Sequence, residues 1–293
     1  MNVFLNRARE LRNGWWIAVF FLVMASTLVP LLIVARRLDA GVPLVGQLAV
    51  VAMTSVFCQR LRGRPFAELS GAFDRTAGLD LLAGCLVGAG IMLVPAAGLM
   101  AAGVVRWSWS GAGLAGIITG IGVCAGTAAT EELLFRGFPF QRLVDGAGST
   151  VAQIVVAAYF VLTHSSAIAM AGEVRFLAAA NIFVASLLFG VAFLRTKGLA
   201  LPFGLHFGAN LTQGTILGFG VSGRSQPRIL VPHAEGPAWL TGGTFGLEAS
   251  VGGFVIILVA WLVLRSGGLR GPASQRSNEK RLKGAGPARR REV

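Results

Sequence analysis

The stretch Thr130-Glu131-Glu132-Leu133-Leu134-Phe135-Arg136-Gly137 decides how the rest of the chain is interpreted. It places two adjacent carboxylates and an arginine at the end of a segment that is otherwise apolar from Gly111 onward. A charge at bilayer depth costs about 2.5–3.5 kcal/mol even on the most lenient scale. Such a cluster is therefore expected where the protein interior uses it. A helix-end ion pair at the level of the lipid headgroups is the plainer alternative.

The spacing within this stretch separates the two carboxylates. Glu132 and Arg136 are four residues apart, so on a helix they share a face and can form an ion pair. Glu131 is rotated by about 100° from Glu132 and has no partner nearby in the sequence. A carboxylate held by a cation, next to one that is left free, is an arrangement that suits general-base catalysis.

Composition points to a membrane protein. Of the 293 residues, 54% are hydrophobic and 13% are charged, and the mean hydropathy is +0.69. Soluble domains contain about 25% charged residues. We therefore predict an all-α, polytopic membrane protein. Cys58, Cys85 and Cys124 lie singly in apolar segments, so packing is a better interpretation for them than a disulfide framework or a thiolate metal site.

Hydropathy predicts about eight transmembrane helices. Their approximate ranges are 15–35, 43–59, 79–105, 111 to the two glutamates, 149–170, 176–194, 199–219 and 247–265. The first is expected to be a retained anchor, because it exceeds the apolar region of a signal peptide. We divide the chain into three N-terminal helices (1–110), a catalytic core (111–219), a loop with the last helix (220–265) and a disordered basic tail (266–293).

The formal charge of +13 reports topology. Most of the 26 basic residues fall in the two tails and in the loops after the second, fourth and sixth spans. Six lie on the other side: Arg36, Arg37, Arg106, Arg175, Arg224 and Arg228. This asymmetry places both termini in the cytoplasm, and we expect a bacterial plasma membrane. The basic tail is expected to contact anionic lipid. Nucleic acid is disfavoured, because no stacking aromatics accompany the basic residues.

Two of the three histidines lie inside predicted spans. His164 follows the apolar segment that begins at residue 149, and His206 is in the seventh span. His206 and Asn210 are four apart and face the same way. Ionisable groups within membrane spans indicate a functional site. We therefore expect the fourth, fifth and seventh spans to converge on one polar pocket.

These side chains could activate water. Glu131 with His164 could polarise a water molecule, and the carboxylate would take its proton. His206 and Asn210 could donate hydrogen bonds to the oxygen of a tetrahedral intermediate. The same pocket could instead hold zinc through Glu131, His164 and His206. The metal-free version is favoured, because the sequence has no HExxH motif and asparagine is a poor zinc ligand.

Other protease chemistries fit less well. Gly220-Val221-Ser222-Gly223 has the GxSG pattern of a serine nucleophile, but it lies where a span enters a loop, so we interpret it as a turn. All four aspartates lie at span ends or in loops, which disfavours an intramembrane aspartyl dyad. The chain has only three lysines, Lys197, Lys280 and Lys283, which disfavours a buried Ser–Lys dyad.

Three short motifs carry a family resemblance. Glu131-Glu132-x-x-x-Arg136, Phe160-x-x-x-His164 and His206-x-x-x-Asn210 resemble, in order, the signatures of the CAAX prenyl protease type II family, also called the CPBP or abortive-infection family. The stretch from Leu188-Phe189-Gly190 to Arg195-Thr196-Lys197-Gly198-Leu199, ahead of His206, resembles a further glycine-containing segment of that family. The resemblance covers about residues 110–215.

The resemblance implies an intramembrane endopeptidase with a CAAX-protease-like helical bundle, whose pocket opens to the cytosolic side. It implies that Glu131 and His164 activate water and that His206 and Asn210 form the oxyanion site. It assigns supporting roles to three further residues: Glu132, Arg136 and Phe160. Many family members are labelled metalloproteases. A peptide, a bacteriocin or the terminus of a membrane protein is the expected substrate.

Two other functions remain open at the level of sequence. The chain could be a catalytically silent interaction or immunity protein of the same fold. It could also be a transporter, because buried acids and histidines relay protons. The absence of a duplicated half in the sequence argues against a transporter.

Overall fold

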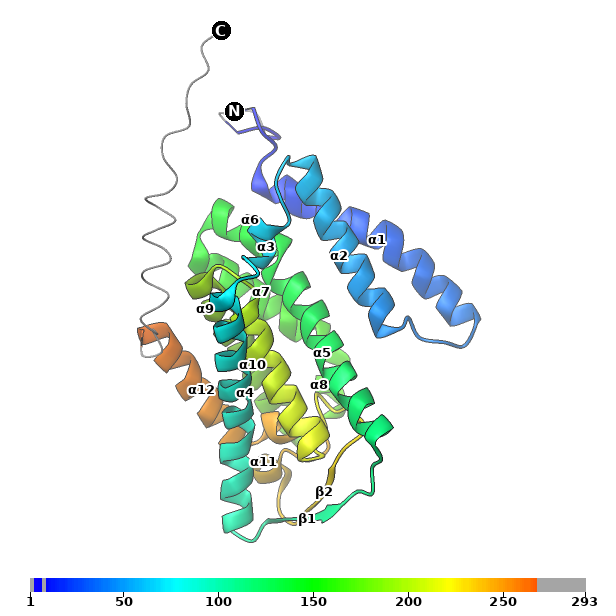
Figure 1. Cartoon of the computed structure of the whole chain (residues 1–293), viewed down its shortest axis with the longest axis vertical. Coiled ribbons are helices and arrows are strands. Elements are labelled where there is room, and N and C mark those ends of the chain that lie inside the picture. Colours follow the sequence, from blue (N-terminus) through cyan, green and yellow to red (C-terminus); the bar gives the residue numbers. More distant parts are fainter. Residues whose placement is uncertain (1–2, 7–8, 268–293) are drawn as a thin grey trace.

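A computed structural model describes residues 3–6 and 9–267 of the chain. It is mostly helical (Figure 1), which confirms the predicted all-α membrane fold. Within the described residues, five helical segments are long and apolar enough to cross a membrane by length and composition. They contain α1 (Asn13–Arg37), α2 (Leu44–Leu61), α4 (Arg75–Ala101), α5 (Leu114–Arg136) and α9 (Arg175–Thr196). The shorter helices are α3 (Ala67–Ser70), α6 (Phe138–Ala147), α7 (Ser149–Thr163), α8 (Ser165–Met170), α10 (Ala200–Asn210), α11 (Ala238–Thr241) and α12 (Val251–Ser266).

Helices α1 and α2 form a hairpin at the side of the bundle. Figure 1 shows this hairpin slanting away from the other helices. It is joined to them through contacts of α1 with α6 and of α2 with α5. A small separate core, Phe20, Cys58, Leu69 and Phe138, packs this junction. Only 6% of the most apolar window of α1 is buried, so most of this helix is free to face lipid.

Helices α4 and α10 are in very close contact along glycines on both helices: Gly84, Gly88, Gly204 and Gly208. A Cβ added at Gly88 would lie 2.2 Å from the carbonyl oxygen of Leu205, and one at Gly208 would lie 2.3 Å from that of Cys85. Small residues let helix backbones approach closely in lipid. The glycines thus fix the position of α10, the helix that carries His206 and Asn210.

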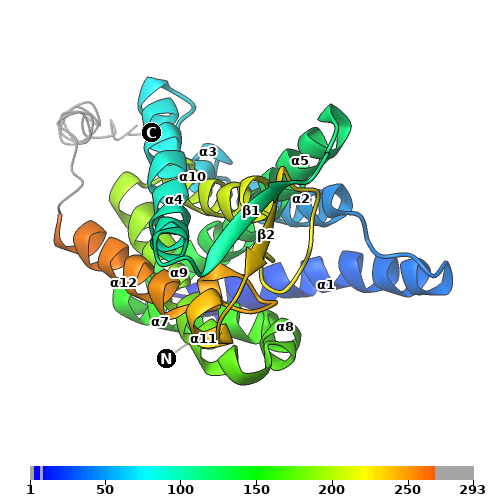
Figure 2. The ribbon, with the colours of Figure 1, turned by 90° about the horizontal axis from the view of Figure 1, so that it is seen from below.

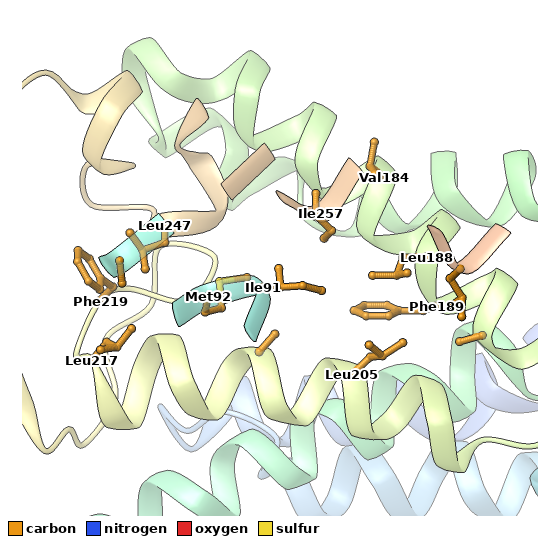
Figure 3. Packing of buried hydrophobic residues seen from close by; sticks show 14 of the residues in the cluster. Ile91, Met92, Val184, Leu188, Phe189, Leu205, Leu217, Phe219, Leu247 and Ile257 are labelled. Atoms are coloured by element: carbon orange, nitrogen blue, oxygen red, sulfur yellow. The ribbon is translucent and has the colours of Figure 1, made fainter. Parts of the chain in front are cut away.

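The main apolar core lies between α4, α9, α10 and α12. Figure 3 shows Leu188 and Phe189 of α9 directed toward Leu205 of α10, with Ile91 of α4 and Ile257 of α12 close by. Several of these side chains are almost fully buried. The core therefore holds α9 and α10 together close to their polar residues, Ser186 on α9 and His206 on α10.

A two-stranded antiparallel ribbon closes one end of the molecule (Figure 2). It pairs β1 (Val105–Trp109) with β2 (Leu230–Ala234), and Trp107 is opposite Pro232. The indole of Trp107 donates to the carbonyl oxygen of Leu217, which ties the ribbon to the end of the seventh predicted span. The prediction of helix as far as residue 105 and of loop throughout 220–246 was wrong here, because strand pairing joins segments far apart in sequence.

All eight predicted apolar segments contain helix, but three differ from a full span. Segment 149–170 is interrupted at His164, between α7 and α8. Segment 199–219 is α10 followed by a π-helical stretch, Leu211–Ile216. The last span begins at Val251. The predicted basic tail lies, from residue 268 onward, outside the described residues. The division of the chain at residue 110 stays a prediction, although α4 packs against α10 across it.

Candidate active site

The cytosolic end predicted for α5 carries a buried ion pair. Arg136 Nη1 lies 3.3 Å from Glu132 Oε1, and the two side chains are 0% and 1% exposed. Arg136 Nη2 also donates to the hydroxyl and the carbonyl oxygen of Ser186 on α9, at 2.9 and 3.0 Å. A buried pair is favourable only when further hydrogen bonds compensate the desolvation. Ser186 provides two of them, while Glu132 Oε2 and Arg136 Nε are buried without a partner among the described residues. The predicted Glu132–Arg136 pair therefore exists and ties α5 to α9.

Aromatic rings surround the same guanidinium. Arg136 Cζ lies 5.1 Å from the ring centroid of Phe189, 5.3 Å from that of Phe160 and 5.9 Å from that of Phe135. A cation within about 6 Å of an aromatic face is attracted to it. These rings come from α5, α7 and α9, so Arg136 is the point where three helices of the site meet.

His206 lies between the two adjacent carboxylates. Its Nδ1 is 2.9 Å from Glu132 Oε1, and its Nε2 is 3.9 Å from Glu131 Oε2. The imidazole also stacks on Phe189, with centroids 5.0 Å apart and planes 10° from parallel. The contact with Glu132 orients the ring and assigns a proton to Nδ1. The other nitrogen is thereby directed toward Glu131.

Glu131 is the accessible carboxylate of the pair. Its side chain is 24% exposed, and no hydrogen-bond partner for it is found among the described residues. A separation of 3.9 Å from His206 Nε2 is too long for a direct hydrogen bond. It leaves room for a water molecule to bridge the two groups. The sequence prediction that Glu132 is held and Glu131 is available agrees with this geometry.

His164 marks a break in the helix. It lies between α7 and α8, and its Nδ1 is 2.8 Å from the carbonyl oxygen of Phe160. A carbonyl only accepts, so Nδ1 carries the proton and the neutral ring has a lone pair on Nε2. Phe160 thus has two contacts at the site, because its ring packs on Arg136 and its carbonyl orients His164.

The helix directions place Glu131 and His164 at a similar level. The rings of Phe135 and Phe160 lie 4.8 Å apart. Glu131 precedes Phe135 by about one turn, and His164 follows Phe160 by about one turn. Helix α5 ends at α6, whereas α7 starts beside it and leads to α8, nearer the ribbon (Figure 1). The two helices therefore run in opposite directions, and both residues lie on the same side of the Phe135–Phe160 contact.

The four predicted catalytic residues are thus brought together to different degrees. Glu131 and His206 face each other at 3.9 Å. Asn210 lies one turn after His206, is partly exposed, and is the last residue of α10. Among the described residues, neither His164 nor Asn210 makes a direct contact with Glu131.

Sequence reasoning missed several contacts. It paired Glu132 only with Arg136, but Glu132 also holds His206. It did not assign a role to Ser186 or Phe189, which contact Arg136 and His206. A polar residue and an aromatic residue three positions apart in an apolar helix are a weak signal, and only the fold shows what they contact.

The Gly220-Val221-Ser222-Gly223 motif forms a turn, as predicted. Ser222 has a φ of 46°, and its hydroxyl donates to Glu248. His233 instead contacts the hydroxyl of Ser108 at 2.8 Å. The Ser222 hydroxyl therefore has no histidine base in this arrangement.

The alternative zinc set does not fit the geometry. In the part of the chain that the structure describes, no group of three or more His, Cys, Asp or Glu side chains is arranged to hold a metal ion. The donor atoms of Glu131, His164 and His206 are not gathered around one point.

Comparison with known families gives one result. Residues 112–212 match the family model described as Type II CAAX prenyl endopeptidase Rce1-like. No curated protein and no solved structure matched the chain. The matched region includes every candidate site residue from Glu131 to Asn210 and confirms the resemblance. The chain is therefore an integral membrane protein that carries, over residues 112–212, an Rce1-like domain of the type II CAAX prenyl endopeptidase family.

Proposed function

We propose that this protein is an intramembrane endopeptidase that hydrolyses a peptide bond with water activated by Glu131 and His164. The observation that carries the proposal is the position of His206. Its ring is held by Glu132 on one side and faces the unbonded Glu131 on the other. One carboxylate is used for positioning, and its neighbour is left available for proton transfer.

Glu131 is the proposed general base. Its partly exposed carboxylate can take a proton from water while the water oxygen bonds to the peptide carbonyl carbon. The lone pair on His164 Nε2 can accept a hydrogen bond from the same water. As the carbon–nitrogen bond breaks, Glu131 returns the proton to the leaving amine. No covalent enzyme intermediate is needed.

His206 and Asn210 are the proposed oxyanion donors. Attack of water places a negative charge on the carbonyl oxygen, and preorganised donors stabilise it. Because Nδ1 already contacts Glu132, donation from Nε2 requires a proton on both nitrogens of His206. Asn210 has no partner among the described residues, so its amide is free to supply a second donor.

Glu132, Arg136 and Phe160 are proposed to position these groups. Glu132 holds His206, Arg136 holds Glu132, and Phe160 links Arg136 to His164. The described residues include no group of three or more His, Cys, Asp or Glu side chains arranged to hold a metal ion, which supports a metal-free version of the mechanism. The reaction is therefore proposed to proceed without a cofactor.

The expected substrate is a peptide or membrane-protein terminus at the cytosolic face of the bilayer. Both termini of the protein are proposed to be cytoplasmic, on the basis of the distribution of arginines. We keep contact of the basic tail with anionic lipid as a proposal, and no nucleic-acid partner is proposed. The competing function is that of a catalytically silent interaction protein of the same fold. The following test distinguishes it from the proposed endopeptidase.

The test compares Glu131→Gln with wild type in liposomes. The substrates are a farnesylated peptide with a CAAX terminus, the same peptide without the prenyl group, and a mixture of membrane-protein termini, with products identified by mass spectrometry. We expect loss of at least about 10²-fold in turnover, since general-base catalysis contributes about 10²–10⁴-fold. Glu173→Gln, at an exposed carboxylate, is the matched control. Cleavage that is unchanged in Glu131→Gln, or absent with wild type for every substrate, contradicts the proposal.

A further inference from the structure

A second polar site lies at the junction of the α1–α2 hairpin with α6. It is a cavity of about 850 Å³ bounded by the N-terminal segment, the start of α1, the end of α2 and the end of α6. We call it the arginine pocket after the four arginines that line it: Arg12, Arg62, Arg64 and Arg142. Among the described lining residues, only Glu10 and Asp145 carry the opposite charge. The pocket therefore has an excess of positive charge.

Arg142 is the most buried of these arginines. Its side chain is 9% exposed, and it contacts Asp145 at 2.9 Å and Asn13 at 3.5 Å. Asp145 is 51% exposed, so water screens the charge that it contributes. The Nε–H of Arg142 is buried and has no partner among the described residues. A buried donor without a partner is costly. The Nε–H of Arg136 is also buried without a partner among the described residues, but only Arg142 lines this pocket, where a bound ligand could supply an acceptor.

The guanidinium group of Arg62 lies against the same aromatic ring as that of Arg142. Its Cζ lies 5.9 Å from the ring centroid of Phe138, and that of Arg142 lies 5.7 Å from the same ring. Burial, followed by the charge of Arg64, lowers the pKa of Arg62. Glu68, Asp145 and Glu10 act on Arg62 in the opposite direction, so the repulsion between the arginines is partly offset, and a bound anion would reduce it further.

The start of α1 adds to the positive potential. Asn13 and Gly14 line the pocket, the first turn contains no acidic residue, and no side chain caps it. The free N–H groups of a helix N-terminus favour anions. The rim is apolar in one direction, because Trp16 and Ile17 line it and α1 continues with exposed apolar side chains.

We propose that the arginine pocket binds a phosphate group, and that its source is the headgroup of an anionic phospholipid. Arg62, Arg142 and the start of α1 would contact the phosphate. The acyl chains would follow the exposed apolar surface of α1. Arginines form bidentate hydrogen bonds with phosphate, which suits the recognition. The residues that line the pocket do not include any of the residues of the Glu131 site, and the proposal does not depend on the proposed protease activity.

The test measures ligand binding to the full-length protein in a neutral detergent, by thermal unfolding and native mass spectrometry. The probes are dioctanoyl phosphatidylglycerol, dioctanoyl phosphatidylcholine and inorganic phosphate. We expect phosphatidylglycerol to bind and to stabilise the fold, and phosphatidylcholine to bind at least tenfold more weakly. Arg62→Gln and Arg142→Gln should each weaken phosphatidylglycerol binding roughly tenfold, as expected for loss of a charged hydrogen bond.

The matched control is Arg37→Gln, which removes one exposed arginine at the other end of α1. It should leave binding unchanged. Stabilisation by inorganic phosphate that the two pocket variants abolish would support a phosphate site and identify free phosphate as a source. Equal binding of the two lipids, or equal phosphatidylglycerol affinity in wild type and Arg62→Gln, overturns the proposal. Arg62→Gln decides the matter should Arg142→Gln fail to fold.

Discussion

Two buried arginines only six residues apart, Arg136 and Arg142, have opposite relations to their surroundings. Arg136 is enclosed by a buried carboxylate, a serine hydroxyl, a carbonyl oxygen and three aromatic rings, all from the chain itself. Arg142 is almost as buried, but its acidic partner is half exposed and it lines an open pocket, whereas the buried Nε–H lacks a partner among the described residues in both arginines. The comparison teaches that burial alone does not define the role of a charge. The partners decide whether it holds the fold or is available to a ligand.

The largest expected difference between these two arginines is in stability. Arg136→Met leaves the carboxylate of Glu132 buried without its cation, which should cost about 3–5 kcal/mol of unfolding free energy. Arg142→Met leaves only a surface carboxylate, so the cost should be about 1 kcal/mol or less. Denaturant unfolding of both variants in detergent measures this. Equal losses would show that the two environments are energetically alike.

The next difference is expected when the acidic partners are changed. Glu132→Gln removes the charge that holds His206, and kcat should fall about 10²–10³-fold with little change in KM, as for loss of an oxyanion donor. Asp145→Asn should leave kcat unchanged and raise phosphatidylglycerol affinity up to about fivefold, because a competing surface charge is removed. Unfolding of Glu132→Gln, measured in parallel, separates a catalytic effect from misfolding. Wild-type kcat in Glu132→Gln would contradict the positioning role.

The smallest difference concerns neutral partners. Ser186→Ala removes one hydrogen bond to Arg136 while the Ser186 carbonyl keeps the other, so a loss of about 1–2 kcal/mol in unfolding free energy is expected. Asn13→Ala removes a 3.5 Å contact to Arg142 and should cost less than about 0.5 kcal/mol. A larger loss for Asn13→Ala than for Ser186→Ala would reverse the comparison.

Much of the catalytic cluster could be predicted because its members are close in sequence. Helical spacing alone pairs Glu132 with Arg136 and separates Glu131 from them, and the structure agrees. Intramembrane histidines are rare enough to identify His206 as a site residue, and the structure places it between the carboxylates. Local periodicity and the cost of burial carry this information.

What could not be predicted depends on tertiary contacts. The helix break at His164 could not be predicted, because the apolar segment continues to residue 170. At the break, the carbonyl oxygen of Phe160 accepts a hydrogen bond from the side chain of His164. The ribbon needs pairing between strands more than 100 residues apart, β1 and β2. The arginine pocket combines residues from three separate parts of the chain. In the sequence, the arginines of each part resemble ordinary charged residues at a membrane interface.

The glycine contacts between α4 and α10 have a mechanical consequence for catalysis. With backbone against backbone, α10 can neither slide nor rotate against α4 without a collision, since even one added methyl group at Gly88 would meet the oxygen of Leu205. The proposed oxyanion donors, His206 and Asn210, therefore lie on a helix that is held rigidly. Any widening that admits a polypeptide is expected on the side of α7, which is interrupted at His164.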